Sequence, residues 1–283
     1  MRVLTTIFLL VILTCSTGQA NDEYDLYLKA GARCKGTHAV QAAQVAFEKY
    51  AQWKEARDKG VDPPPGAFQD AGQAFEYLVK NGCKDGLVLY RYGNMLRHHH
   101  ECEKAVANIK RSIEDVEKHY PTYMNFVYFA MAYCSTNLRR YEDAIRYYKQ
   151  AIEYDPRDVN SRINLCRRYY WNGQRREAYE AAKYVLEKLG DQTSPYGKGI
   201  CFNTLGWVAL DNNEVQEAVD YFTKAYDLRQ RPSDLEGLAW AYEKVDPRKA
   251  DEYWKRLVEF RREHARPKLR NETEERLKQL MKK

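Results

Sequence analysis

One spacing of small and aromatic residues recurs along most of this 283-residue chain and limits what it can fold into. In one segment Ala132 is followed by Ala144, Tyr148, Ala151 and Pro156. Residues three and four apart share a face of an α-helix, so the three central residues form one stripe. Ala132 lies on a preceding helix, and a small residue facing another lets two antiparallel helices pack closely. Proline then ends the second helix.

The same spacing returns in four other places, with a turn one residue shorter in the last of them. Those positions are Gly93, Ala105, Ile109 and Ser112; Cys166, Ala178, Ala182 and Val185; Gly206, Ala218, Phe222 and Ala225; and Ala239, Ala250, Trp254 and Leu257. A fixed internal period of this kind is typical of repeat proteins built from one supersecondary unit. The pattern therefore predicts an all-α chain of stacked helix pairs.

The repeated positions resemble those of the tetratricopeptide repeat (TPR) family. The resemblance covers residues 86–260 as five units and implies a right-handed α-solenoid of tetratricopeptide-like helix pairs. Two departures from the family pattern are that Cys166 stands where a Gly or Ala is usual, and that most units lack the final proline.

Two flanking segments fit the same architecture. Residues 21–85 are expected to form a divergent N-terminal helical pair, because Ala71, Phe75 and Leu78 have the register of a second helix and an alanine-rich run from 39 to 57 could be its partner. Residues 261–283 are rich in basic side chains and are expected to form a C-terminal capping helix or a tail. Such caps keep the last apolar face of a solenoid from water.

The first residues read as an export signal at 1–20. Arg2 precedes an apolar run from 3 to 13, which is too short to span a bilayer as a mature helix, and Gly18-Gln19-Ala20 has the form that signal peptidase accepts. We therefore expect a periplasmic or secreted protein. The residues before Cys15 resemble a lipoprotein signal, so an outer-membrane lipoprotein anchored at Cys15 is the alternative.

The distribution of charge and the catalytic motifs that the sequence lacks limit the classes of function that we expect. The 46 basic and 40 acidic residues are interspersed, whereas a nucleic-acid footprint clusters basic groups, so we expect no nucleic-acid partner. The sequence has no nucleophile elbow, phosphate loop, dinucleotide fingerprint or His-Glu-x-x-His motif. We expect no enzymatic activity and no cofactor.

The cysteines of an exported chain favour disulfides. Without Cys15 the candidates are Cys34, Cys83, Cys102, Cys134, Cys166 and Cys201. In the family that the chain resembles, the second helix of one unit packs on the first helix of the next, which favours Cys102 with Cys134. Cys166 with Cys201 is the next choice, and Cys34 with Cys83 is what remains. Buried thiols are the alternative.

The run Arg97-His98-His99-His100-Glu101-Cys102 carries three kinds of metal ligand. Consecutive helical residues point about 100° apart, so three adjacent imidazoles cannot converge on one ion. We expect a polar turn and no metal site, with metal binding or delivery through His98–His100 kept as an alternative function.

Proteins of this family bind partners on a concave face lined by their first helices. The residues of those helices that do not face the second helix are the expected groove, and they are Tyr90, Arg91, Asn94, Arg97, Phe126, Phe129, Tyr133, Asn160, Asn164, Arg167, Trp171, Asn203, Trp207 and Trp240. Asparagine can bond a peptide backbone and arginine can hold a carboxylate. For the aromatic members, packing between repeats is the alternative.

The sequence thus predicts a non-enzymatic protein–protein interaction scaffold of an extracytoplasmic compartment that binds a peptide or protein segment in its groove. An oligomerising structural component of an envelope assembly is a further alternative. The partner and the oligomeric state do not follow from the sequence.

Overall fold

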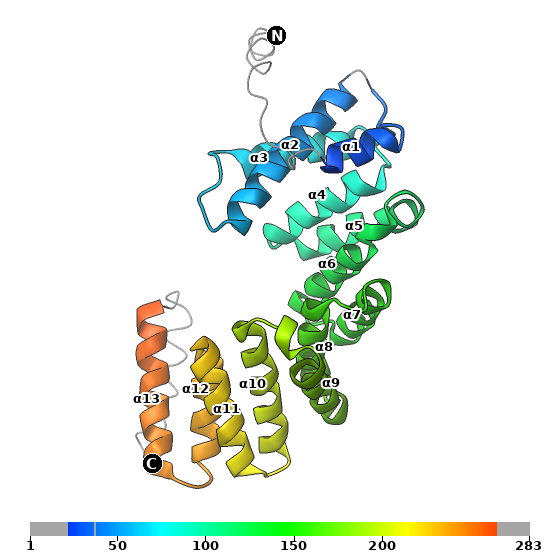
Figure 1. The fold of residues 1–283 in the computed structure, drawn as a ribbon. Coiled ribbons are helices and arrows are strands. Elements are labelled where there is room, and N and C mark those ends of the chain that lie inside the picture. Colours follow the sequence, from blue (N-terminus) through cyan, green and yellow to red (C-terminus); the bar gives the residue numbers. More distant parts are fainter. Residues whose placement is uncertain (1–21, 37, 265–283) are drawn as a thin grey trace. The chain divides into compact units, whose positions relative to one another are not determined.

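The computed structural model describes residues 22–36 and 38–264 (Figure 1). The described residues contain α-helices and no strand, which confirms the predicted all-α fold. The chain divides into two compact units between Met124 and Asn125, and each is treated separately below. The predicted signal at 1–20, Cys15 and residues 265–283 of the predicted cap lie outside the described residues.

Within the described residues of the first unit, five α-helices precede the boundary. These are α1 (Asp22–Lys29), α2 (Ala39–Asp58), α3 (Ala67–Lys80), α4 (Gly86–His98) and α5 (Cys102–His119), followed by the short 3₁₀ helix η1 (Pro121–Tyr123). Helices α2 and α3 stand where the sequence predicts the N-terminal pair. Phe75 of α3 contacts the rings of Phe47 and Tyr50 on α2, and Ala71 and Leu78 are buried.

The second unit continues the pairs. It contains α6 (Met124–Asn137), α7 (Tyr141–Tyr154), α8 (Val159–Trp171), α9 (Arg175–Lys188), η2 (Gly190–Gln192), α10 (Pro195–Asp211), α11 (Val215–Arg229), α12 (Pro232–Tyr242) and α13 (Pro247–His264). No helix among the described residues is both long and apolar enough to cross a membrane. The predicted limits of the repeat region, 86 and 260, stay predictions.

Small residues lie where paired helices touch. Ala132 of α6 and Ala144 of α7 are fully buried, as are Cys166 of α8 and Ala178 of α9. Where the pattern has glycine, an aromatic ring uses the space: a Cβ atom on Gly206 would lie 2.7 Å from the Phe222 ring. The space at these positions is therefore filled by the facing helix.

Four of the helix pairs are joined by the same turn. In each, one residue takes the left-handed conformation, and these residues are His100 (φ 64°), Arg139 (58°), Gly173 (81°) and Asn213 (64°). The next amide donates to the carbonyl five residues back, at 2.8–3.0 Å, and the left-handed residue donates to the carbonyl three back, at 3.0–3.1 Å. These two hydrogen bonds define the Schellman motif, which satisfies carbonyls at a helix end. The histidine run is therefore one example of a repeated turn.

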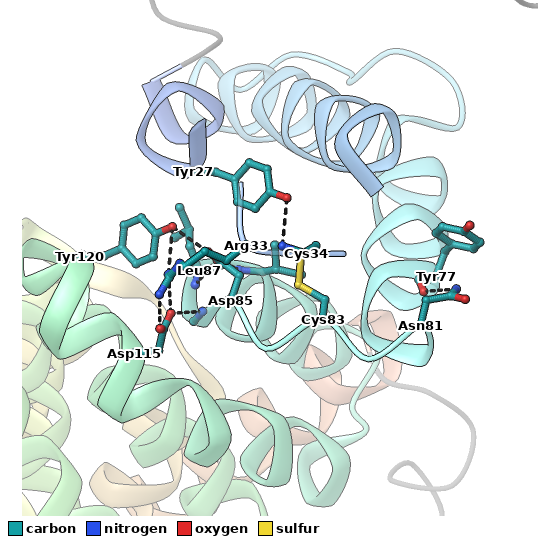
Figure 2. Close-up of a disulfide and its surroundings, with 12 residues drawn as sticks. Tyr27, Arg33, Cys34, Tyr77, Asn81, Cys83, Asp85, Leu87, Asp115 and Tyr120 are labelled. Carbon is teal, nitrogen blue, oxygen red and sulfur yellow. Dashed lines mark hydrogen bonds and ion pairs between the residues drawn. A yellow bond between two sulfur atoms is a disulfide. The ribbon is translucent and has the colours of Figure 1, made fainter. Parts of the chain in front are cut away.

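A disulfide joins the N-terminal segment to the loop before α4. Cys34 and Cys83 form the bond, and Figure 2 shows it beside Arg33, which donates to Asp85 Oδ2 at 2.8 Å and to Asp115 Oδ2 at 2.6 Å. Asp85 also accepts from the amides of Leu87 (2.9 Å) and Val88 (3.1 Å), which caps α4. Its carboxylate thus ties the start of a repeat helix to the segment that follows α1.

The disulfide that the sequence favoured is not formed. Cys102 and Cys134 are buried thiols, and so are Cys166 and Cys201. Cysteine is a small apolar side chain that packs well in a core without oxidation. The pair that was left over by elimination, Cys34 with Cys83, is the one that the structure joins.

We predict that Gly206→Ala lowers the free energy of unfolding by about 1–3 kcal/mol, because the added methyl group overlaps the buried Phe222 ring. Chemical denaturation monitored by circular dichroism measures the change. Gly190→Ala is the matched control, since a Cβ atom there meets nothing within 4 Å, and its effect should stay within about 0.5 kcal/mol. Equal stability of both variants would contradict the role assigned to the small residues.

Candidate functional site

The predicted groove residues on α4 are committed to contacts within the first unit. Arg91 is 5% exposed and pairs with Glu23 of α1, Nε donating to Oε2 at 2.7 Å. Its Nη1 donates to the hydroxyl of Tyr50 at 3.0 Å, and Asn94 Nδ2 donates to the same oxygen at 3.1 Å. Tyr90 is also buried. The prediction that Tyr90, Arg91 and Asn94 line an open groove is therefore wrong, because α1 and α2 cover these side chains.

The remaining polar member on α4, Arg97, turns toward the histidine run. Its Nε donates to Asn94 Oδ1 at 2.8 Å, and its Nη2 lies 2.9 Å from Nε2 of His98. The imidazole of His98 packs edge-on against the rings of Trp53 (5.1 Å between centroids) and Phe68 (5.9 Å). This end of α4 is a packed contact with α2 and α3.

The metal alternative gains no support from this cluster. The ring of His99 is tilted against that of Phe68 with centroids 5.1 Å apart, so two of the three imidazoles contact aromatic rings. Within residues 22–36 and 38–264 no group of three or more His, Cys, Asp or Glu side chains is placed to hold a metal ion. Burial lowers the pKa of His98 to about 4, and the charge of Arg97 acts in the same direction.

In the second unit the predicted aromatics of α6 differ among themselves. Phe126 is 53% exposed, whereas Phe129 is half-buried and contacts Tyr148 of α7 at 5.8 Å between centroids. Tyr133 is half-buried as well. Phe129 therefore serves packing between helices, which was the stated alternative for the aromatic members.

A hollow of about 160 Å³ lies along α8, α10 and α12. Its lining residues are Arg167, Tyr170, Trp171, Asn203, Thr204, Trp207, Ser233 and Glu236. Four of these residues were predicted. Arg167 and Trp171 lie on α8, and Asn203 and Trp207 lie on α10, the first helix of the next pair. The structure thus brings together part of the predicted set in one place.

The other predicted residues of this unit lie outside the hollow. Asn164 Nδ2 donates to the carbonyl of Asn160 at 2.8 Å within α8. Trp240 of α12 packs edge-on against Trp254 of α13, with centroids 5.5 Å apart. The asparagine bond is thus local to the exposed side of α8, and Trp240 contributes to the packing of α12 on α13.

Aromatic rings form one wall of the hollow. Tyr170 contacts Trp171 at 5.8 Å and Trp207 at 6.4 Å between centroids, and Trp207 rests on Phe222 at 5.1 Å. Trp171 is nevertheless 57% exposed. A large indole held by ring contacts and open to solvent loses little side-chain entropy on binding, which suits an anchor for a ligand.

Polar groups on the opposite side are already ordered. Asn203 Nδ2 donates to Asp234 Oδ1 at 2.8 Å and to the Ser233 carbonyl at 3.2 Å. Burial raises the pKa of Asp234, and its ion pair with Arg229 (2.5 Å) opposes that rise. These bonds fix the Asn203 side chain at the floor of the hollow.

Arg167 is the exception among the polar lining residues. No hydrogen bond, ion pair or ring contact to its guanidinium is found in the described part of the chain, whereas Glu236 across the hollow pairs with Arg261 at 3.3 Å. Burial, followed by the charge of Arg167, lowers the pKa of its neighbour Arg168. The hollow therefore presents a cation that no other side chain of the described residues neutralises.

Sequence reasoning missed Tyr170, Thr204, Ser233 and Glu236. Tyr170 lies three residues after Arg167 on α8, so the helical spacing that selected Trp171 also points to it. Glu236 gave no comparable signal, because its place depends on how α12 packs beside α10.

Comparison with known proteins agrees with this architecture. A model of the tetratricopeptide repeat matches residues 126–158. No curated protein matches the sequence.

Solved structures match over much of the chain. YrrB, described as a TPR protein with an unusual peptide-binding site, is 15% identical with a TM-score of 0.50 and covers 69% of this chain and 95% of its own. PilF of Pseudomonas aeruginosa is 20% identical (TM-score 0.51; 62% and 75% covered), and MamA AMB-1 is 16% identical (0.52; 67% and 99%). At these identities the likeness shows the fold.

Residues 126–158 thus match a tetratricopeptide repeat, and the helix-pair fold of the chain is similar to that of solved TPR structures, as the recurring spacing predicted. The repeat match covers α6 and α7, the pair in which the sequence pattern is most complete.

We predict that stability falls as the pH drops from about 6.5 toward 4. The pKa of His98 is lower in the folded state (about 4) than in the unfolded chain (about 6.5), so the unfolded state binds the extra proton in this window. Above pH 6.5 the His98 imidazole is neutral in both the folded and the unfolded state, so its full contribution to the free energy of unfolding is present. Arg57, Arg97, His99 and His100 face the imidazole and oppose its protonation.

Thermal unfolding between pH 8 and 4.5 measures this effect. The variant His98→Gln should show a shallower loss of Tm across the window than the wild type, whereas His38→Gln, at an exposed position, should follow the wild type. Parallel curves for His98→Gln and the wild type would contradict the assignment.

Proposed function

We propose that this protein is a non-enzymatic scaffold that binds an extended segment of a partner protein in the hollow along α8, α10 and α12. The observation that carries the proposal is the uncommitted guanidinium of Arg167 beside a preordered aromatic wall. TPR folds act in protein–protein interaction, and one similar structure is described as having a peptide-binding site.

The lining residues indicate what kind of segment fits. Arg167 can form two parallel hydrogen bonds to a carboxylate, and such bidentate pairs are among the stronger protein hydrogen bonds. Trp171 and Trp207 offer apolar area next to it. We therefore expect the bound segment to carry an acidic group adjacent to an apolar or aromatic side chain.

The size of the hollow limits the contact to a few side chains. A space of about 160 Å³ is below the 300–1,000 Å³ typical of small-molecule sites, which favours a segment that inserts one side chain and lies along the helices for the rest. The ordered Asn203 amide and the Thr204 hydroxyl lie at the floor for polar contacts with that inserted group.

The compartment is part of the same proposal. A disulfide between Cys34 and Cys83 fits an oxidising environment, and the sequence offers an export signal at 1–20 that would deliver the chain there. We propose that the mature protein is periplasmic or secreted, cleaved after Ala20, with a lipid anchor at Cys15 as the alternative.

We predict that Arg167→Ala weakens binding of a selected peptide by about tenfold or more, the effect expected when a buried charge pair loses one member. The probe is a peptide selected from a random phage-displayed library on the full mature chain, and the measurement is a titration followed by tryptophan fluorescence. Trp171→Ala should weaken the same peptide by a comparable factor, as hot-spot aromatics do.

Arg176→Ala is the matched control, because this arginine is exposed on α9 and is not a lining residue of the hollow. It should leave the affinity unchanged. Peptides that bind the wild type, the Arg167→Ala variant and the Trp171→Ala variant equally well would remove the hollow as the binding site.

We predict that protein expressed with its own N-terminus in a Gram-negative host is exported and begins at Asn21. N-terminal sequencing and intact mass of the protein from a periplasmic extract test this. A lipidated N-terminus at Cys15 would select the alternative, and a full-length chain retained in the cytoplasm would overturn the proposed compartment.

A further inference from the structure

Two cysteine side chains meet directly behind the hollow. Cys166 of α8 and Cys201 of α10 are both 0% exposed and belong to one core cluster, with Ile163, Val185 and Leu205 among its other members. Both side chains lie in the core where α8 packs against α10. The helices that carry the lining of the hollow therefore share a core that holds both thiols.

The pair is linked to the lining of the hollow. Cys166 Sγ lies 3.0 Å from the carbonyl oxygen of Ile163 and 3.8 Å from Oγ1 of Thr204, which lines the hollow. Arg167 follows Cys166 in the chain. A change at the sulfurs is thus one residue away from the groups that would hold a ligand.

The two thiols differ in acidity. Interaction with the Cys201 thiol lowers the pKa of Cys166, with a further contribution from Arg167, while interaction with Cys166 and burial raise the pKa of Cys201. The thiolate is the nucleophile in thiol–disulfide exchange, so Cys166 is the side chain expected to attack first and Cys201 the one that resolves.

We propose that Cys166 and Cys201 are a redox pair that closes to a disulfide and staples α8 to α10 behind the hollow. The oxidant is a disulfide, either that of a thiol–disulfide oxidoreductase or oxidised glutathione. The Cys166 thiolate attacks one sulfur of the oxidant, which forms a mixed disulfide and releases one thiolate. Cys201 loses its proton and attacks Cys166 Sγ, which releases the second. Two electrons pass to the oxidant, and the two protons end on its released thiols.

Burial decides when this exchange occurs. Because neither sulfur is exposed in the folded unit, the oxidant reaches Cys166 during folding or when this part of the unit opens locally. In the reduced state no covalent bond joins the two helices. In the oxidised state the helix bearing Arg167 and Trp171 is covalently tied to the helix bearing Asn203 and Trp207, so the hollow becomes more rigid.

The test refolds the full mature chain in glutathione buffers from reducing to oxidising. The protein is then unfolded in denaturant that contains N-ethylmaleimide, which blocks the unpaired thiols, and a non-reducing digest is mapped by mass spectrometry. The expected result in oxidising buffer is a linked Cys166–Cys201 peptide, lighter by two hydrogen atoms than its parts, and a Tm higher by about 5–10 °C than in the reduced form with Cys34–Cys83 still joined.

The variant Cys166→Ala should fold, because alanine occupies the equivalent repeat position at Ala132 and Ala239, and it should lose both the linked peptide and the Tm difference. Cys102→Ala is the control and should keep both. The proposal is overturned if Cys166 and Cys201 carry the blocking group in every buffer in which Cys34 and Cys83 are linked. This test does not involve peptide binding, so its outcome is independent of the proposed function.

Discussion

The contact between a small residue on one helix and its partner helix is the interaction on which the rest of this structure depends. Gly206 leaves room for the Phe222 ring, and alanines face each other between α6 and α7. Close approach lets apolar area be buried along each pair, which for short helices supplies most of their stability. It also sets the direction of each first helix, and so it decides which side chains of α8, α10 and α12 converge on one hollow.

The same constraint explains how far the sequence could predict the fold. Helical pairs follow from spacing alone, because three- and four-residue intervals place side chains on one face whatever the partner. The turns between paired helices were harder to predict from the sequence. His100, Arg139 and Asn213 take the left-handed conformation that glycine takes at Gly173, so no shared residue type marks them. Backbone hydrogen bonds at the helix end maintain the turn, and these leave little trace in the sequence.

The candidate site was predicted in part for a related reason. Arg167, Trp171, Asn203 and Trp207 were found because their exposure depends on their own helix and its neighbours in the repeat. Arg91 was misassigned because its carboxylate partner, Glu23, is on a helix outside the repeat pattern, and such a long-range ion pair has no periodic signal. The Cys34–Cys83 disulfide was hard to predict for the same reason. Both cysteines lie before the regular units, where the family resemblance does not indicate which residues are close.

We propose that the second unit holds a partner segment through the guanidinium of Arg167 and an aromatic wall on α8 and α10. The five tryptophans of the chain provide the most direct measurement, by ¹⁵N correlation spectra of their indole N–H groups with and without a selected peptide. We expect the signals of Trp171 and Trp207 to shift while that of Trp53, in the first unit, stays in place. Shifts largest at Trp53, or binding without any shift at Trp171 and Trp207, would contradict it.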